Sequence, residues 1–149
     1  MFEQLPGLAI IPFFAGFFTQ FVKVVIHVAK GDFTWRVLDR YGGMPSAHSA
    51  FVVSLTTVVG LHEGLSSPLF AVAAVFSFLT IRDAMGLRQY LGWHSRILNM
   101  LIKELPNAEE QKFPEYIEEH LGHTPLQVTV GGLIGVLIAG LLYPLFFPA

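Results

Sequence analysis

Two histidines stand at the beginnings of apolar stretches, where the N-terminus of a helix would carry each of them. His48 directly follows Ser46 and Ala47, and His123 precedes Pro125 by two residues. A helix N-terminus presents unpaired backbone N–H groups and the positive end of the helix dipole, so it suits an anion. Two imidazoles beside one phosphoryl group could divide its transfer: one attacks phosphorus, and the other protonates the leaving oxygen and later activates water. Neither role needs a metal or another cofactor, and we expect none.

Cationic and hydroxyl groups fall near the same ends of the apolar stretches. Lys23 lies in the last turns of the helix predicted for the first stretch, and Arg88 follows the third. Together they could surround a tetrahedral oxyanion with donors, because an arginine can bind two phosphate oxygens at once. Ser46 would add a hydroxyl donor, and Ala47 lies where the backbone N–H groups are unpaired. The residue types therefore predict a phosphate-binding site.

Four charge-free stretches must position these residues. Residues 4–22, 41–62, 64–81 and 124–149 contain no Asp, Glu, Lys or Arg, and each is near or above the roughly 18 residues typical of a membrane-spanning helix. We expect spanning helices over residues 8–29, 46–61, 68–85 and 125–146. With one or two short interfacial helices they predict an all-α integral membrane bundle, forming a single domain over residues 1–149.

The remaining polar region, residues 88–122, separates the third and fourth stretches. Apolar residues recur at helical spacing from Leu87 to Leu105, which predicts a helix lying on the interface or on the bundle. Asn107 has the spacing of a helix start, which predicts a second short helix. Pro114 could open a final turn or two that ends at Gly122.

The composition excludes several classes of function. Only 13% of the 149 residues are charged and 53% are hydrophobic, whereas about 25% charged residues is usual in soluble proteins. A net charge of −2 provides no basic field, so we expect no nucleic-acid partner. The chain has no cysteine, which excludes disulfides, thiolate metal sites and cysteine nucleophiles.

The distribution of cations predicts the orientation. All nine Lys and Arg residues fall on the side of the predicted site or at its boundary, and both termini fall on the other side with the turn at residues 62–64. By the positive-inside rule, the site would face the cytoplasm from the cell (inner) membrane.

Three motifs together resemble those of a known superfamily, the type 2 phosphatidic acid phosphatases and vanadium-dependent haloperoxidases, and specifically its small divergent bacterial and plastid branch. They occur in order as Pro45-Ser46-Ala47-His48, similar to Pro-Ser-Gly-His; Asp83-Ala84-x-Gly86-x-Arg88, similar to the middle motif of the divergent branch; and His123 with Gln127, Val128 and Gly131, similar to His-x-x-x-Asp-Val-x-x-Gly. The resemblance covers about residues 20–135.

The resemblance implies a phosphatase that works through a phosphohistidine intermediate, with His123 as the nucleophile and His48 as general acid and then base. It implies a set of residues that hold the phosphoryl oxygens, namely Lys23, Ser46, Arg88 and the backbone at Ala47. Asp83 and Gln127 would support these residues without contacting the phosphate. A site at head-group depth beside apolar helices favours a substrate whose tail stays in the bilayer. Phosphatidate, phosphatidylglycerophosphate and polyprenyl phosphates all fit.

The last motif departs from the superfamily pattern in two ways. The superfamily has an Arg six residues before its His, where this chain has Ile117, and Arg88 is the first candidate to replace that cation. Gln127 stands where the superfamily has the Asp that orients the nucleophile. Its amide oxygen can still accept from the imidazole but contributes no negative charge. Asp83 or Glu119 would have to supply that charge.

The superfamily's first motif, Lys-x6-Arg-Pro, has no clean match. Lys23 fits the divergent branch, and it is our preferred candidate. Lys30 and Arg36 approximate the spacing without the proline, so Arg36 is a further candidate for binding the phosphate.

Two other functions remain open from the sequence. The chain could bind an anionic lipid or phosphate at the same polar mouth without catalysis, or it could form an ion or proton pathway through Lys23, Asp83 and the histidines. The spacing of Gly131 and Gly135 favours close helix packing in lipid, and it is also found where two copies of a chain pair, which would make a homo-oligomer.

Overall fold

The computed structural model describes residues 5–31, 43–106, 112–114, 116–119 and 121–148. Its helices are α1 (Leu5–Lys30), α3 (Ala47–Glu63), α4 (Pro68–Met85), α5 (Leu87–Lys103) and α7 (Pro125–Phe146). No strand occurs in the described ranges, so the all-α prediction is confirmed. The bounds of α4 and α7 coincide with the predicted spans, because Ser67 and Thr124 cap helices whose first residues are prolines.

Three helical segments are long and apolar enough to cross a membrane: Gly7–Lys30, Pro68–Lys103 and Pro125–Phe146. The helix α3 has 17 residues, a length of about 26 Å, which is slightly less than the roughly 30 Å of a hydrocarbon core. Three candidate spans are therefore established by length and composition, and the fourth, at α3, stays a prediction.

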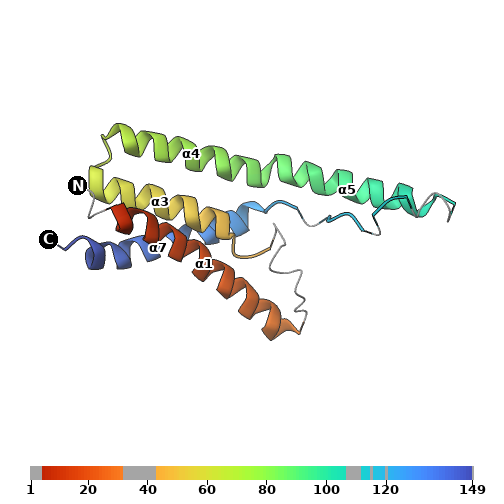
Figure 1. Ribbon diagram of the computed structural model, residues 1–149, viewed down its shortest axis with the longest axis horizontal. Helices are drawn as coiled ribbons and strands as arrows, with labels where there is room; N and C mark the ends of the chain where they lie inside the picture. The colour runs from red at the N-terminus through yellow and green to blue at the C-terminus, as the bar shows by residue number, and fades with distance from the viewer. Residues whose placement is uncertain (1–4, 32–42, 107–111, 115, 120, 149) are drawn as a thin grey trace.

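The helix α3 occupies the centre of the bundle and contacts α1, α4 and α7. The chain direction places the beginnings of α3 and α7 and the end of α4 at one end of the bundle, as Figure 1 shows. The beginning of α1 and the end of α7 lie at the opposite end. This arrangement brings together the polar segments that were predicted to form the site.

Two glycines allow α7 to approach α3 closely. A Cβ atom on Gly131 would fall on the backbone oxygen of Ser46, and one on Gly135 would fall on the backbone oxygen of Ala50. Both glycines are buried. The helix α3 of the same chain therefore occupies the face that could have paired two copies, and the oligomer contact at this motif is corrected to an intramolecular one. Homo-oligomerisation by another surface stays a prediction.

The polar region differs from its prediction in two respects. The helix α5 forms as expected, but after a break at Gly86 it continues the direction of α4 beyond the bundle (Figure 1). Of its two predicted placements, the one on the bundle is therefore wrong, and the one on the membrane interface stays a prediction. The predicted helical turns after Pro114 are wrong for residues 116–119, which are not helical. The second short helix predicted from Asn107 begins outside the described residues.

The side chain of Asn99 explains why residues 116–119 are not helical. Its Nδ2 donates to the backbone oxygen of Ile117 at 2.8 Å, and the backbone N–H of Ile117 donates to its Oδ1 at 3.1 Å. Gly92 leaves room for the chain, because a Cβ there would lie 2.6 Å from the backbone oxygen of Glu119. Both backbone groups of Ile117 are thus satisfied by α5 rather than by a helix of their own.

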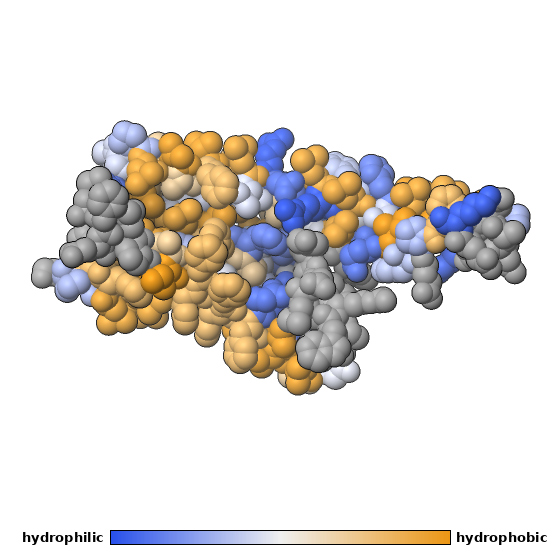
Figure 2. All heavy atoms as spheres, in the orientation of Figure 1, coloured by the Kyte–Doolittle hydropathy of each residue, from blue (hydrophilic) through white to orange (hydrophobic). Residues whose placement is uncertain are grey.

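The distribution of apolar residues on the surface is typical of a protein that lies in a membrane. Figure 2 shows apolar residues over most of the bundle and a polar band across it, close to the junction of α4 and α5. Exposed phenylalanines line α1, namely Phe13, Phe14, Phe17, Phe18 and Phe21. An apolar surface of this extent is suited to lipid rather than to water.

Candidate active site

The helix α1 contributes Lys23 at the end of a buried stripe. Ile11, Ala15, Thr19 and Lys23 follow one another at intervals of four residues, so they share one face of the helix. Lys23 is only 3% exposed. Its side chain passes close to Gly43, where a Cβ would lie 3.7 Å from Lys23 Cδ. The ammonium group is therefore carried toward the loop that precedes α3.

The helix α3 contributes its N-terminal turn. Ser46 is the N-cap, and its Oγ accepts from the backbone N–H of Ser49 at 3.3 Å and from Ser49 Oγ at 3.0 Å. Because Ser46 accepts in both bonds, it can still donate its own O–H. Ala47 and His48 begin the helix, where backbone N–H groups have no partner within the helix. This turn offers the donors that the sequence predicted.

The backbone of His123 is clamped between α4 and α5. Its N–H donates to the backbone oxygen of Ala84 at 2.9 Å, and its carbonyl oxygen accepts from Gln89 Nε2 at 2.8 Å. Gly122 has a φ of 88°, a conformation that favours glycine, and a Cβ there would lie 2.8 Å from Gln89 Cγ. The sequence analysis did not single out Gln89, since 34 residues separate it from His123 and no local pattern links them.

The N-termini of α3 and α7 meet directly. The backbone N–H of Ser46 donates to the backbone oxygen of Gln127 at 3.2 Å. This contact brings the two predicted catalytic rings together: the centroids of His48 and His123 are 6.0 Å apart, with an angle of 76° between the ring planes. At that separation both rings can reach one tetrahedral anion.

His123 is a buried, neutral imidazole beside positive charge. It is 1% exposed, and among the described residues neither of its ring nitrogens has a hydrogen-bond partner. Burial, followed by the charges of Lys23, His48 and Arg88, lowers the pKa of His123 from 6.5 to about 4. The ring is therefore unprotonated at neutral pH, as a nucleophile must be.

Arg88 and Asp83 form an ion pair at the junction of α4 and α5. Arg88 Nε donates to Asp83 Oδ2 at 2.8 Å. The charge of Arg88 acts on His123, so its position is compatible with replacing the arginine that the last motif lacks at Ile117. Asp83 therefore holds the guanidinium group of Arg88 at its Nε.

Gln127 and Glu119 do not support the His123 ring in the expected way. Gln127 Oε1 accepts from the backbone N–H of Thr124 at 3.0 Å, as part of a capping box, and the expected bond from the His123 ring is not present between these described residues. Glu119 accepts from Asn99 Nδ2 at 2.8 Å and from Arg96 Nε at 3.4 Å. Its carboxylate therefore joins residues 116–119 to α5.

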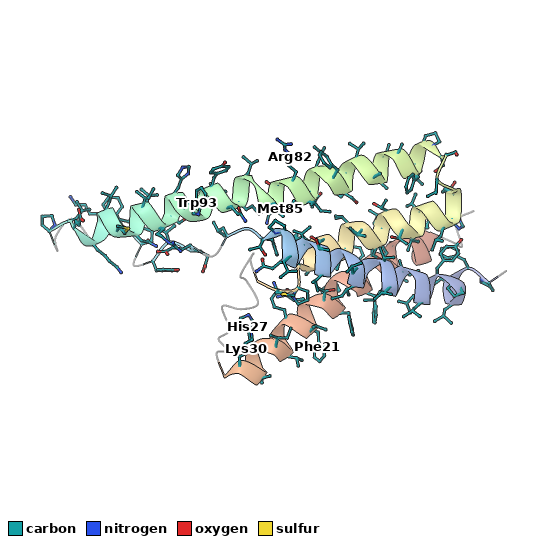
Figure 3. All side chains as sticks on the ribbon, turned by 180° about the vertical axis from the view of Figure 1, so that it is seen from behind. Phe21, His27, Lys30, Arg82, Met85 and Trp93 are labelled. Atoms are coloured by element: carbon teal, nitrogen blue, oxygen red, sulfur yellow. The ribbon has the colours of Figure 1, made fainter. Side chains whose placement is uncertain are left out.

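The other candidate cations lie apart or outside the description. Arg36 lies outside the described residues. Lys30 is exposed at the end of α1, beyond the other helices, and Arg82 points away from the bundle (Figure 3). Of the candidates for the first motif that the structure describes, Lys23 is the buried one.

A pocket of about 340 Å³ opens beside His123. Its lining combines the His123 segment with α5 and the loop before α3, and comprises Gly43, Gln89, Trp93, Arg96, Glu119, Leu121, Gly122, His123, Thr124 and Gln127. The pocket therefore offers an approach to the buried His123 from the side of α5.

The model of the family described as the Divergent PAP2 family matches residues 7–138. The chain belongs to this family. The resemblance inferred from the three motifs is therefore confirmed. An uncharacterized membrane protein of Bacillus subtilis (strain 168), YuiD, is 39% identical to this divergent PAP2 protein over 132 residues, which cover 81% of this chain and 84% of the relative. No solved structure matches the chain.

In this divergent PAP2 protein, the described site combines a neutral imidazole, a second histidine, two cations and the N-terminus of a helix. Lys23 and Arg88 provide positive charge, and the single carboxylate described within the motif residues, Asp83, is paired with Arg88. The excess of donors and positive charge suits a multiply charged oxyanion. A phosphoryl group meets this requirement.

Proposed function

We propose that this membrane protein is a metal-independent phosphatase that hydrolyses a lipid phosphate or diphosphate through a phosphohistidine intermediate. In the first step a ring nitrogen of His123 attacks phosphorus, the bond from phosphorus to the leaving oxygen breaks, and His48 gives that oxygen a proton. In the second step His48 takes a proton from water, the water oxygen attacks phosphorus, and the bond between phosphorus and nitrogen breaks. Inorganic phosphate and the dephosphorylated lipid are the products.

The phosphoryl oxygens would be held by Lys23, Arg88, the Ser46 hydroxyl and the backbone N–H groups at Ala47. These donors compensate the charge that develops on the oxygens in the transition state. Arg36 remains a candidate for the same role, from outside the described residues.

The single observation that carries the proposal is the state of His123. A fully buried polar ring without a hydrogen-bond partner among the described residues is costly. Its low pKa keeps it neutral, and the second histidine lies 6.0 Å away, between ring centroids. A bound phosphoryl group would give the ring a partner, because its phosphorus is the atom that a ring nitrogen attacks.

The hydrogen bond that Gln127 makes favours a second candidate function, in which the protein binds an anionic lipid at the same place without catalysis. The amide oxygen of Gln127 caps α7, so it does not orient the imidazole or stabilise a charged phosphohistidine. Binding would then depend on Lys23 and Arg88 and would not need the nucleophile.

Phosphate release from dioleoyl phosphatidate in detergent micelles distinguishes the two candidates. We expect release by the unmodified protein and its loss, by at least a hundredfold, in His123→Ala and His48→Ala. His94→Gln, an exposed histidine on α5, is the matched control and should keep full activity. Acid-labile phosphate should be trapped on the protein and be absent in His123→Ala. Release that neither alanine substitution changes would refute the phosphatase, and binding without release would favour the second candidate.

We infer that the site faces the cytoplasm, because the described Lys and Arg residues lie at or beyond the site end of the bundle, while the beginning of α1 and the end of α7 lie at the other end (Figure 1). The cysteine-free chain makes this easy to test. In intact cells an impermeant maleimide should label Ser66→Cys, in the turn before α4, and should spare Lys103→Cys until the membrane is permeabilised. The reverse labelling pattern would overturn the inference.

A further inference from the structure

A second hollow lies between α1 and α3, directly beside the oxyanion donors. It has a volume of about 240 Å³ and is lined by Phe13, Gly16, Phe17, Gln20, Ala47 and Phe51. Ala47 belongs to the first turn of α3, between Ser46 and His48. The hollow therefore begins where the phosphoryl group is proposed to bind.

The character of this groove changes along its length. At the site end it has Gln20, which precedes Lys23 by one helical turn, and the backbone of Ala47. Further along, the aromatic rings of Phe13, Phe17 and Phe51 form its walls. The rings of Phe13 and Phe51 meet edge to face with centroids 5.2 Å apart.

Gly16 leaves the groove between α1 and α3 unfilled, because it has no side chain. A Cβ on Gly16 would lie 3.4 Å from Phe51 Cβ, and Gly16 has no side chain that would fill the space between the two helices. On the open side Phe17 is 72% exposed, so it can move to admit a ligand. The groove is thus open to the apolar surroundings along α1.

We propose that this groove binds the hydrocarbon chain of the phosphate substrate. The inference rests on the proposed function, and it specifies the substrate as an amphiphile whose chain leaves the phosphate directly along α1 and α3. The groove has a polar, cationic end near Lys23, where the phosphate head would lie. Its far end is apolar, and there the chain would lie over Phe51.

A larger apolar hollow, of about 520 Å³ between α3 and α4, does not meet the same requirement. It is lined from Val53 to Leu61 on α3 and by Leu65 and Phe70, so it lies along the half of α3 remote from His48. A chain attached to a phosphate at His123 would have to pass the first turns of α3 to reach it. It serves as the internal control.

In a bilayer the groove would contribute orientation rather than affinity, because a lipid chain is already in apolar surroundings. Misplacing a reacting group by about 1 Å can cost roughly a hundredfold in rate. The effect of the groove should therefore appear as a preference for long-chain substrates over substrates that have no chain.

The test compares dioleoyl phosphatidate with para-nitrophenyl phosphate, which has no chain. Gly16→Leu fills the groove, and Phe17→Ala removes an exposed wall without affecting the core. We expect each to lower the ratio of the lipid rate to the aryl phosphate rate by about tenfold. Phe18→Ala, on the exposed surface of α1, and Ala74→Leu, in the hollow between α3 and α4, should leave the ratio unchanged.

Binding gives a readout that does not depend on turnover. A long-chain alkyl phosphate with a diazirine in the middle of its chain should label the segments around Phe17 and Phe51, and Gly16→Leu should abolish that labelling. An unchanged rate ratio in both groove variants, or labelling of α4 instead, would overturn the inference. If the unmodified protein hydrolyses neither substrate but is labelled in the groove, the phosphatase proposal fails and the chain-binding groove stands.

Discussion

Gln89 on α5 donates a hydrogen bond from Nε2 to the backbone oxygen of His123 at 2.8 Å. The bond joins the segment that carries the proposed nucleophile to a helix outside the bundle. Because it holds the main chain rather than the ring, we expect Gln89 to act by positioning His123. The backbone N–H of His123, bound to Ala84 O, provides the second point of attachment.

We expect Gln89→Leu to reduce kcat by roughly tenfold to a hundredfold with little change in KM, because the imidazole loses its alignment while the phosphate donors remain. His94→Gln, also on α5, is the control. Trapping of phosphate on the protein should slow in parallel with kcat. A rise in KM with unchanged kcat would show that Gln89 contacts substrate instead of positioning His123.

The close contact between α3 and α7 can be tested at its glycines. In Gly131→Ala and Gly135→Ala the new methyl group would meet the backbone of α3 at Ser46 or Ala50. The helices must then separate, at a cost of about 1–3 kcal/mol in stability, and the distance between His48 and His123 should increase.

We therefore expect a lower thermal midpoint in detergent and a loss of activity for both variants. Gly140→Ala is the matched control, because a Cβ at Gly140 has nothing within 4 Å. Equal stability of all the variants would contradict the packing of α7 on α3.

The low pKa of His123 makes stability depend on pH. In the unfolded chain this histidine has a pKa near 6.5, and in the folded protein its pKa is about 4. Between these values the unfolded state binds a proton that the folded state does not bind. The contribution is therefore fully present above pH 6.5 and is lost as the pH falls toward 4, by about 3 kcal/mol in total.

The measurement is the free energy of unfolding in detergent at pH 7.5 and pH 4.5, for the unmodified protein and for His123→Asn. The loss on acidification should be smaller in His123→Asn, while His94→Gln should behave as the unmodified protein does. The same loss in all three proteins would mean that His123 has an ordinary pKa.

The ion pair between Asp83 and Arg88 predicts an effect on substrate binding. Asp83→Asn removes the carboxylate that holds the Arg88 guanidinium at 2.8 Å, so that Arg88 should bind phosphate with poorer alignment. We expect KM for dioleoyl phosphatidate to rise several-fold and the inhibition constant for inorganic phosphate to rise with it. Arg88→Lys should give a similar change, because lysine lacks the two-pronged geometry of arginine. Unchanged constants in both variants would remove Arg88 from the site.

The sequence by itself determined the helices and the chemical groups at their ends. Charge-free stretches, Ser46 and Thr124 as caps, and prolines at the first turns are local signals, and the predicted bounds agree with α3, α4 and α7 to within two residues. The motifs around His48 and His123 were sufficient to identify the family, since their spacing and order do not depend on how the helices pack.

Only the tertiary structure decided how those groups are used. Gln127 could reach either Thr124 or the His123 ring, and the local capping bond is the one formed. Gln89 and Asn99 find partners on a segment distant in sequence, which periodicity cannot predict. The contact between Gly131 and Ser46 depends on which face α7 presents to α3. A helical sequence pattern shows that a helix has a packing face. Which helix packs against that face depends on the close packing of the whole chain.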